Sequence, residues 1–169
     1  KELLFRDAML LHQSGRYEES VSQYRRVLTD QTDRYFASLD PGIAGAKTRH
    51  NLAVVYEDMG RLQDAEAEWW TIVDADPEYR PGWQELGQLL LKQNRTSEIR
   101  ELAAKLCADS QLKAVGRLLS ARLAESQSEF DEAITVLEAA VAESPSDLEA
   151  HSELCRLLFE RGLPTDAEA

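Results

Sequence analysis

Residues of one kind recur every 34 positions along this chain of 169 residues. A fixed period of this length is typical of solenoids, in which each repeat is a small unit that buries its apolar face against its neighbours. Such an array presents surface rather than a deep catalytic pocket. The series that carry the period are Ala65, Ile99, Ala133 and Ala167; Pro77 and Pro145; and Leu52, Leu86 and Leu154.

Residues 46–79 show what one repeat contains. Leu52 and Tyr56 lie four positions apart, on one stripe of an amphipathic helix. Gly60 can adopt the left-handed backbone that ends such a helix. The apolar pattern then resumes and stops before Pro77, which cannot continue a helix. Each repeat is therefore predicted to be two antiparallel helices, called A and B below.

The period predicts four repeats and a partial fifth in a single domain, residues 1–169. From Gly15 to Gly60 is 45 residues instead of 34, so an insertion of 11 is expected at about 35–45. Asn94 stands where repeat two has its turn glycine. Ser128 opens a segment that looks like a capping box ending at Asp131. The repeats span about 1–34, 46–79, 80–113, 114–147 and, in part, 148–169.

Trp83, Leu86 and Gly87 form the W-x-x-L-G opening of the tetratricopeptide repeat (TPR) consensus. With the 34-residue period, nearly the whole chain resembles the TPR family. The resemblance implies an all-α, right-handed superhelix of helix–turn–helix repeats whose concave groove is lined by the A helices. It also implies a non-catalytic scaffold that binds a peptide or a partner domain.

A narrower resemblance covers residues 38–69. This stretch is similar to the C-terminal TPR part of some bacterial family-2-type glycosyltransferases, which carry a glycine-containing insertion before an RHNLA-like helix. The alternative function is therefore an accessory arm of a larger glycosyltransferase that positions an acceptor or mediates self-association. Asp74-Ala75-Asp76 has the spelling of a DxD pair, but it precedes Pro77 and is interpreted as a solvated helix end.

The net charge of −12 and the pI of about 4.7 argue against binding to nucleic acid or to an anionic membrane. No apolar run approaches the length needed to span a bilayer. The excess of acidic residues favours a basic partner, or these residues simply form an acidic face exposed to solvent. Cys107 and Cys155 fit small buried core residues, which suits a reducing, cytoplasmic setting.

The position of each residue within the 34-residue repeat predicts which A-helix residues line the groove. They could converge on a carboxylate or a peptide backbone, or they could be ordinary solvated residues. Asn51 suits backbone recognition because an amide offers a donor and an acceptor together. The predicted groove residues are Arg6, Met9, Lys47, His50, Asn51, Val54, Gln84, Gln88 and Arg122.

Trp70 follows the core residue Trp69 and falls at a phase that is usually polar. It is expected either to contact another chain, since exposed tryptophans are enriched at interfaces, or to cover a neighbouring part of this one. Self-association through the terminal helices is a further possibility.

Enzymatic chemistry is not predicted. His12, His50 and His151 lie in different repeats without the paired spacing of metal ligands. The sequence suggests no nucleophile–base constellation and no Gly-rich phosphate loop, so no catalytic residue, cofactor or metal is expected.

Overall fold

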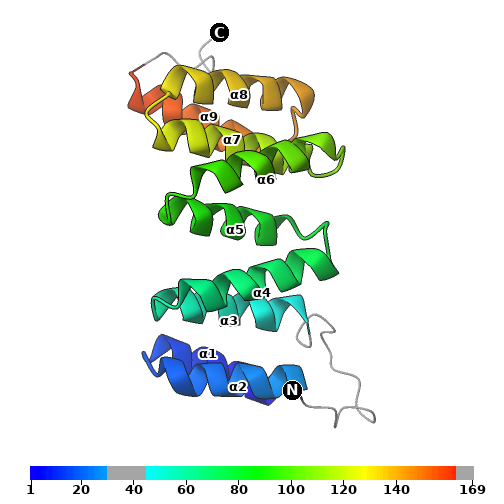
Figure 1. The fold of residues 1–169 in the computed structure, drawn as a ribbon, viewed down its shortest axis with the longest axis vertical. Coiled ribbons are helices and arrows are strands. Elements are labelled where there is room, and N and C mark those ends of the chain that lie inside the picture. The colour runs from blue at the N-terminus through cyan, green and yellow to red at the C-terminus, as the bar shows by residue number, and fades with distance from the viewer. Residues whose placement is uncertain (30–44, 163–169) are drawn as a thin grey trace. The chain divides into compact units, whose positions relative to one another are not determined.

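The computed structural model describes residues 1–29 and 45–162, and the regular structure in these ranges is α-helical (Figure 1). The A helices are α1, α3, α5, α7 and α9, and the B helices are α2, α4, α6 and α8. This confirms the predicted all-α arrangement of helix–turn–helix repeats. The bounds are α1 (Glu2–Gln13), α2 (Tyr17–Thr29), α3 (Ala46–Asp58), α4 (Leu62–Ala75), α5 (Arg80–Lys92), α6 (Thr96–Ala108), α7 (Lys113–Ser126), α8 (Phe130–Glu143) and α9 (Leu148–Glu160).

The chain divides into two compact units, residues 1–86 and 87–169. In the first unit α1 packs against α2, α2 against α3, and α3 against α4. Its largest buried side chains include Tyr24, Tyr56 and Trp69, which occupy the predicted core phases. The single domain expected from the sequence stays a prediction. The predicted insertion at about 35–45 falls almost entirely outside the described residues.

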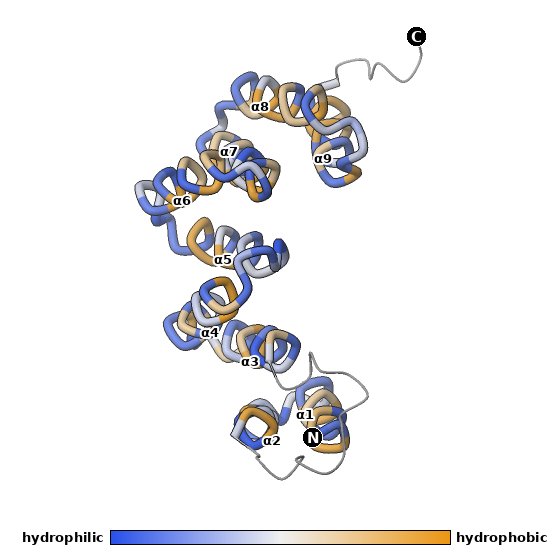
Figure 2. The backbone as a smooth tube through the Cα atoms, turned by 90° about the vertical axis from the view of Figure 1, so that its right-hand side faces the viewer, coloured by the Kyte–Doolittle hydropathy of each residue, from blue (hydrophilic) through white to orange (hydrophobic). Residues whose placement is uncertain are grey.

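In the second unit α6 packs against α7, α7 against α8, and α8 against α9. Leu118, Leu137 and Leu157 come from three different helices and meet in one buried cluster. Hydropathy alternates along each of these helices in Figure 2, as expected when one stripe faces the core and the other faces water. None of the described helices is long and apolar enough to cross a membrane.

Every A helix ends at a residue with left-handed backbone. The φ values are 74° at Gly15, 71° at Gly60, 56° at Asn94 and 65° at Gly162. In this C-terminal motif the amide two positions past the helix end reaches back to a carbonyl five residues earlier. Arg61 N thus donates to Tyr56 O at 2.8 Å, and the same bond recurs in repeats one, three and four. The predicted roles of Gly60 and Asn94 are confirmed.

Ser128 occupies the corresponding position in repeat four, with a φ of 64°. The predicted capping box is therefore wrong. The residue that precedes α8 is Glu129, and no side chain caps the first turn of that helix. Ser128 instead closes α7, where a left-handed backbone is costly for a residue with a Cβ atom.

A second series of small residues marks the places where helices approach closely. Thr48, Gly82, Gly116 and Ala150 are spaced by 34 residues, and all four are buried. A Cβ atom on Gly116 would lie 2.6 Å from the backbone nitrogen of Cys107 and 2.8 Å from the carbonyl oxygen of Ala103. The start of α7 therefore crosses α6 with almost no side chain between the two backbones.

In repeat one, a serine occupies the position on the B helix that corresponds to the small residue Ala65 of repeat two. Ser20 is fully buried, and its hydroxyl donates to the carbonyl of Ala8 at 2.8 Å. This bond satisfies the hydroxyl where α1 and α2 cross.

The expectation that both cysteines are buried is wrong for Cys155, which is exposed on α9. Cys107 is half-buried beside Gly116, and burial raises the pKa of its thiol. A raised pKa keeps this sulfur protonated and unreactive at neutral pH.

Replacing Ser128 with glycine is expected to stabilise the protein by about 0.5–1 kcal/mol, because the left-handed strain disappears at the cost of a more flexible unfolded chain. Urea unfolding measures the change. Asn94→Gly is the matched control and should gain less, because asparagine tolerates this conformation. Loss of stability in Ser128→Gly would contradict the argument.

Gly116→Ala is expected to destabilise the protein by about 1–3 kcal/mol, because the new methyl group overlaps backbone atoms that cannot move independently. Gly87→Ala is the matched control: the three atoms nearest to its Cβ position all belong to the side chain of Leu119, which can shift more readily than backbone. Urea unfolding should therefore show a smaller loss for Gly87→Ala, and the reverse order would refute this account of the helix crossing.

Candidate functional site

The exposed face of α3 carries four of the predicted groove residues. Lys47, His50, Asn51 and Val54 are spaced i, i+3, i+4 and i+7, which places them along one face of the helix. Lys47 is exposed, and the other three are half-buried. These four side chains therefore lie in one row along α3, and their role in lining a groove stays a prediction.

His50 lies among aromatic rings. Its imidazole meets the indole of Trp69 edge to face, with ring centroids 4.9 Å apart, and lies at right angles to the ring of Tyr79. The Tyr79 hydroxyl is 3.4 Å from His50 Nδ1. Behind the imidazole, Trp69 Nε1 donates to Glu57 at 3.1 Å. These contacts fix the orientation of the imidazole ring.

Burial lowers the pKa of His50, against the opposing pull of the Glu85 and Glu57 carboxylates. The imidazole is therefore neutral at physiological pH and offers one donor and one acceptor instead of a positive charge. The amide nitrogen of Asn51 donates to the carbonyl of Lys47 at 2.8 Å, and its amide oxygen has no hydrogen-bond partner among the described residues.

On α1, the guanidinium of Arg6 donates to Glu2 of the same helix at 2.6 Å. Met9 is exposed one turn further along. On α5, Gln84 and Gln88 are half-buried and lie one turn apart on the same helix face. Gln84 belongs to the first unit and Gln88 to the second.

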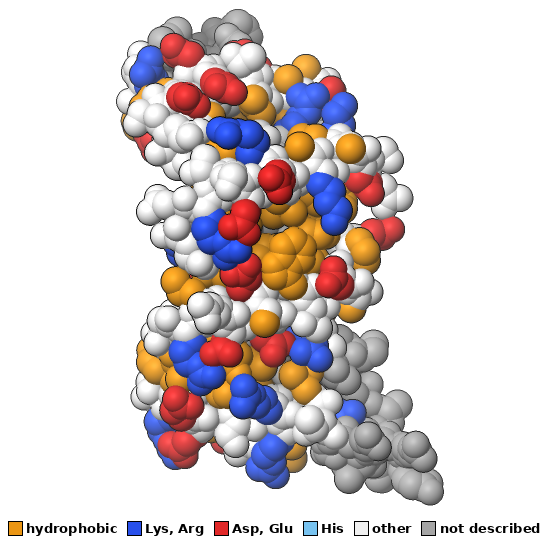
Figure 3. Space-filling model, viewed as in Figure 1, with side chains coloured by type: hydrophobic (Ala, Val, Ile, Leu, Met, Phe, Trp, Pro, Cys, Tyr) orange, Lys and Arg blue, Asp and Glu red, His pale blue; other side chains and the backbone are white. Residues whose placement is uncertain are grey.

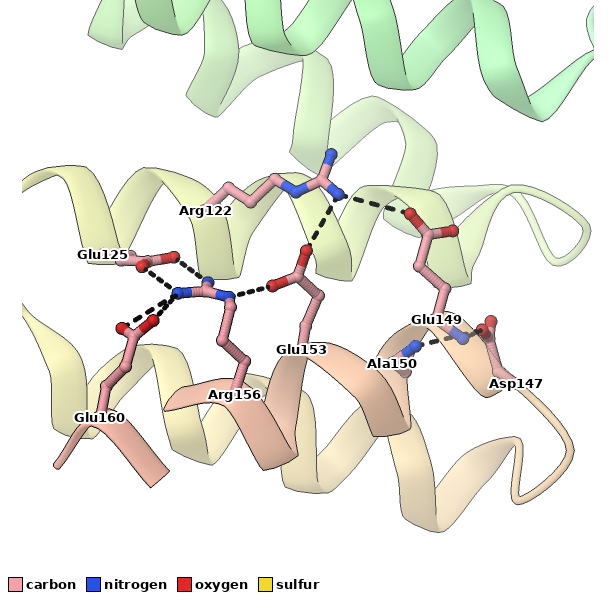
Figure 4. Close-up of polar contacts among 8 residues, drawn as sticks. All are labelled: Arg122, Glu125, Asp147, Glu149, Ala150, Glu153, Arg156 and Glu160. Carbon is pink, nitrogen blue, oxygen red and sulfur yellow. Dashed lines mark hydrogen bonds and ion pairs between the residues drawn. The ribbon is translucent and has the colours of Figure 1, made fainter. Parts of the chain in front are cut away.

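Arg122 lies on α7, and its guanidinium is held by two carboxylates of α9 (Figure 4). It donates to Glu149 at 3.3 Å and to Glu153 at 3.2 Å. Glu153 also accepts from Arg156, which donates in addition to Glu125 on α7 and to Glu160. The guanidinium of Arg122 is thus paired with carboxylates of the next A helix, and its predicted role in lining a groove stays a prediction.

Trp70 is half-buried against the indole of Trp83, with ring centroids 6.1 Å apart at 89°. Trp83 donates its own N–H to the carbonyl of Pro77 at 2.8 Å. Trp70 therefore covers a residue of the following A helix. A contact between its remaining exposed edge and another chain stays a prediction.

Within residues 1–29 and 45–162, no three His, Cys, Asp or Glu side chains gather as ligands for a metal ion. Asp74, Ala75 and Asp76 are all exposed at the end of α4, as expected for a solvated helix end. Where described acidic groups form ion pairs, their partner is most often an arginine.

The lowered pKa of His50 makes stability depend on pH. Because the folded state binds the proton less readily than the unfolded state, stability falls as the pH drops below the ordinary histidine value of 6.5. The slope for one proton is at most about 1.4 kcal/mol per pH unit.

The difference in unfolding free energy between wild type and His50→Gln should therefore shrink on acidification from about pH 8 to about pH 5. Urea unfolding across this range measures it. At the alkaline end, where His50 is neutral in both states, the same comparison reports packing alone. A difference independent of pH would contradict the assignment.

Two segments of the chain match sequence models of the tetratricopeptide repeat, residues 46–69 and 124–169. No curated protein has significant sequence similarity to the chain. The first segment lies within residues 38–69, whose similarity to the TPR part of glycosyltransferases stays a prediction.

Solved structures share the fold. A tetratricopeptide repeat protein from Parabacteroides merdae aligns with a TM-score of 0.63 at 19% identity, over 95% of this chain and 59% of that one. This chain thus spans little more than half the length of that relative. TTC0263, a thermophilic TPR protein of Thermus thermophilus, aligns with a TM-score of 0.57 at 20% identity, over 95% of this chain and 82% of that one.

MamA from Desulfovibrio magneticus aligns with a TM-score of 0.57 at 13% identity, over 95% of this chain and 85% of that one. At these identities the likeness concerns the fold. The chain thus contains tetratricopeptide repeats and has the all-α fold of tetratricopeptide repeat structures.

Proposed function

We propose that this chain is a non-catalytic protein-interaction module that binds an extended peptide segment on the A-helix surface of its first unit. The observation that carries the proposal is the row of Lys47, His50, Asn51 and Val54 along the exposed face of α3. TPR folds commonly serve as interaction scaffolds, which supports the proposal at the level of fold.

The chemistry of this row suits a peptide backbone. Neutral His50 has no hydrogen-bond partner at Nε2 among the described residues, and Asn51 presents its amide oxygen. Peptide N–H and C=O groups need partners of both kinds. The imidazole is held by Trp69 and Tyr79, so little side-chain entropy is lost on binding.

The net charge of −12 gives no long-range attraction to a polyanion. On the face seen in Figure 3, where α2 and α4 lie in front of α1 and α3, acidic and basic side chains lie beside one another. Recognition on the A-helix surface of the first unit would depend on short-range hydrogen bonds and on Val54, with Arg6, Met9 and Gln84 as further contacts. Gln88 and Arg122 belong to the second.

The accessory arm of a glycosyltransferase stays a prediction that rests on residues 38–69 alone. Its test is the coding sequence on both sides of this segment. A nucleotide-sugar domain encoded in the same frame would support it, and its absence there would end it.

Self-association also stays a prediction. The terminal A helices expose large apolar side chains, with Leu3 at 84% on α1 and Phe159 at 81% on α9. Elution above the monomer mass of 19.1 kDa would support it, and a monomer at all concentrations would refute it.

The peptide proposal is tested with a displayed library of unstructured peptides selected on the wild-type protein. Selected peptides should bind Lys47→Ala/Asn51→Ala about tenfold more weakly, which corresponds to about 1.4 kcal/mol. The matched control is Gln63→Ala/Asp74→Ala on α4, where both residues are exposed. Binding should be unchanged in the control.

His50→Gln keeps a donor and an acceptor and should retain part of the binding. Thermal unfolding establishes that each variant is folded. The proposal would be wrong if the selected peptides bound both double variants equally weakly, or bound both as tightly as they bind the wild-type protein.

A further inference from the structure

A pocket of about 430 Å³ opens on the second unit, and none of the proposed peptide-binding residues lines it. It lies between the B helices α6 and α8, beside the C-terminal end of α7. Its volume falls in the range of ordinary ligand sites, about 300–1,000 Å³. Its lining residues are Arg100, Ala104, Ser120, Leu123, Ala124, Gln127, Glu129 and Glu132.

The two carboxylates of this pocket interrupt a pattern that the other repeats keep. At the start of each earlier B helix an arginine pairs with the acidic residue three positions later. Arg16 bonds Glu19 at 2.7 Å and 2.5 Å, and Arg95 bonds Glu98 at the same two distances. Arg61 bonds Asp64 at 2.7 Å.

Repeat four places Glu129 at the arginine position and Glu132 at the acidic position. Neither carboxylate has a side-chain partner among the described residues. Two acidic groups thus stand where each earlier repeat has an arginine–carboxylate pair. Two carboxylates on one lining can together accept hydrogen bonds from a guanidinium, as the acidic partner does in each earlier repeat.

The rest of the pocket suits the stem of an arginine. Leu123 and Ala124 are buried and form an apolar floor for methylene groups. The Ser120 hydroxyl donates to the carbonyl of Gly116 at 3.0 Å, so toward the pocket it can only accept. Acceptors therefore outnumber donors on this lining.

Arg100, on α6, is the cation of the pocket and has no side-chain partner among the described residues. It would repel a bare cation, but it can donate to a carbonyl oxygen. A ligand that carries a guanidinium at one end and peptide carbonyls at the other satisfies both sides of the pocket. A polypeptide presents this combination at each of its arginine residues.

We propose that this pocket receives an arginine side chain of a partner polypeptide, with the guanidinium on Glu129 and Glu132 and a neighbouring backbone carbonyl on Arg100. The site lies on the B-helix side of the second unit. It is therefore separate from the peptide surface on α3, and either site can exist without the other.

The probe is the peptide acetyl-Ala-Arg-Ala-amide, titrated into isotope-labelled protein while amide shifts are followed by NMR. Binding in the range of about 1 mM is expected for one anchored side chain. Amides of α6, α7 and α8 around the pocket should shift, and acetyl-Ala-Gln-Ala-amide should shift none of them. Absence of shifts with the arginine peptide would overturn the proposal.

Two variants examine the carboxylates. Glu129→Arg restores the pair found in the other repeats and should remove binding while the protein stays folded. Glu129→Gln/Glu132→Gln should weaken binding about fivefold, as expected for two partly exposed ion pairs. Glu138→Gln, on an exposed site of α8 outside the pocket, is the matched control. Unchanged binding in Glu129→Arg would refute the proposal.

N-butylguanidinium distinguishes a polypeptide from a small cation. The peptide should bind more tightly than this monocation to the wild-type protein. In Arg100→Gln the difference in affinity between the peptide and N-butylguanidinium should shrink. The peptide loses the hydrogen bond from Arg100 to its carbonyl, and N-butylguanidinium is no longer repelled by the positive charge of Arg100. Tighter binding of N-butylguanidinium to the wild-type protein would overturn the assignment to a polypeptide.

Discussion

The described helices bury their apolar stripes mainly against the helices next to them in sequence, and the rest of the structure depends on that contact. Tyr24 and Trp69 are buried at the same position of the B helix in repeats one and two. Close approach is possible because small residues occur at the crossings, as at Gly116. Core formation therefore leaves the outward faces of the helices free to vary, and the candidate sites lie on those faces.

Periodicity predicted much of the fold because packing recurs with the repeat. Gly60 and Asn94 were identified as turn residues from phase alone, and their backbones are left-handed. Ser128 was misread because its local spelling matched a capping motif, whereas its phase matched Gly60. For this residue, its position within the 34-residue repeat predicted the backbone better than the local motif did, because the same helix crossing imposes the same backbone in every repeat.

The candidate sites were less predictable, because charge pairing is not set by the core. The row on α3 followed from helix spacing, but the neutrality of His50 depends on rings contributed by α4 and the following turn. The hydrogen bonds from Arg122 to Glu149 and Glu153 on α9 join residues that are 27 and 31 positions apart in the sequence. Glu129 and Glu132 could be seen in the sequence. That they differ from the other repeats became clear only from the arginine–carboxylate pairs that the structure shows there.

The turns between A and B helices have a consequence for how such a chain can change. Apart from the adjoining residues, no atom lies within 4 Å of the place where a Cβ atom would stand at Gly15 or Gly60. The backbone at these two turn glycines is therefore open on the side where a side chain would project, and bonds to the preceding helix maintain its conformation. Chain added at a tip would extend into solvent without entering the core. These turns are points at which new recognition loops can be grafted onto an unchanged scaffold.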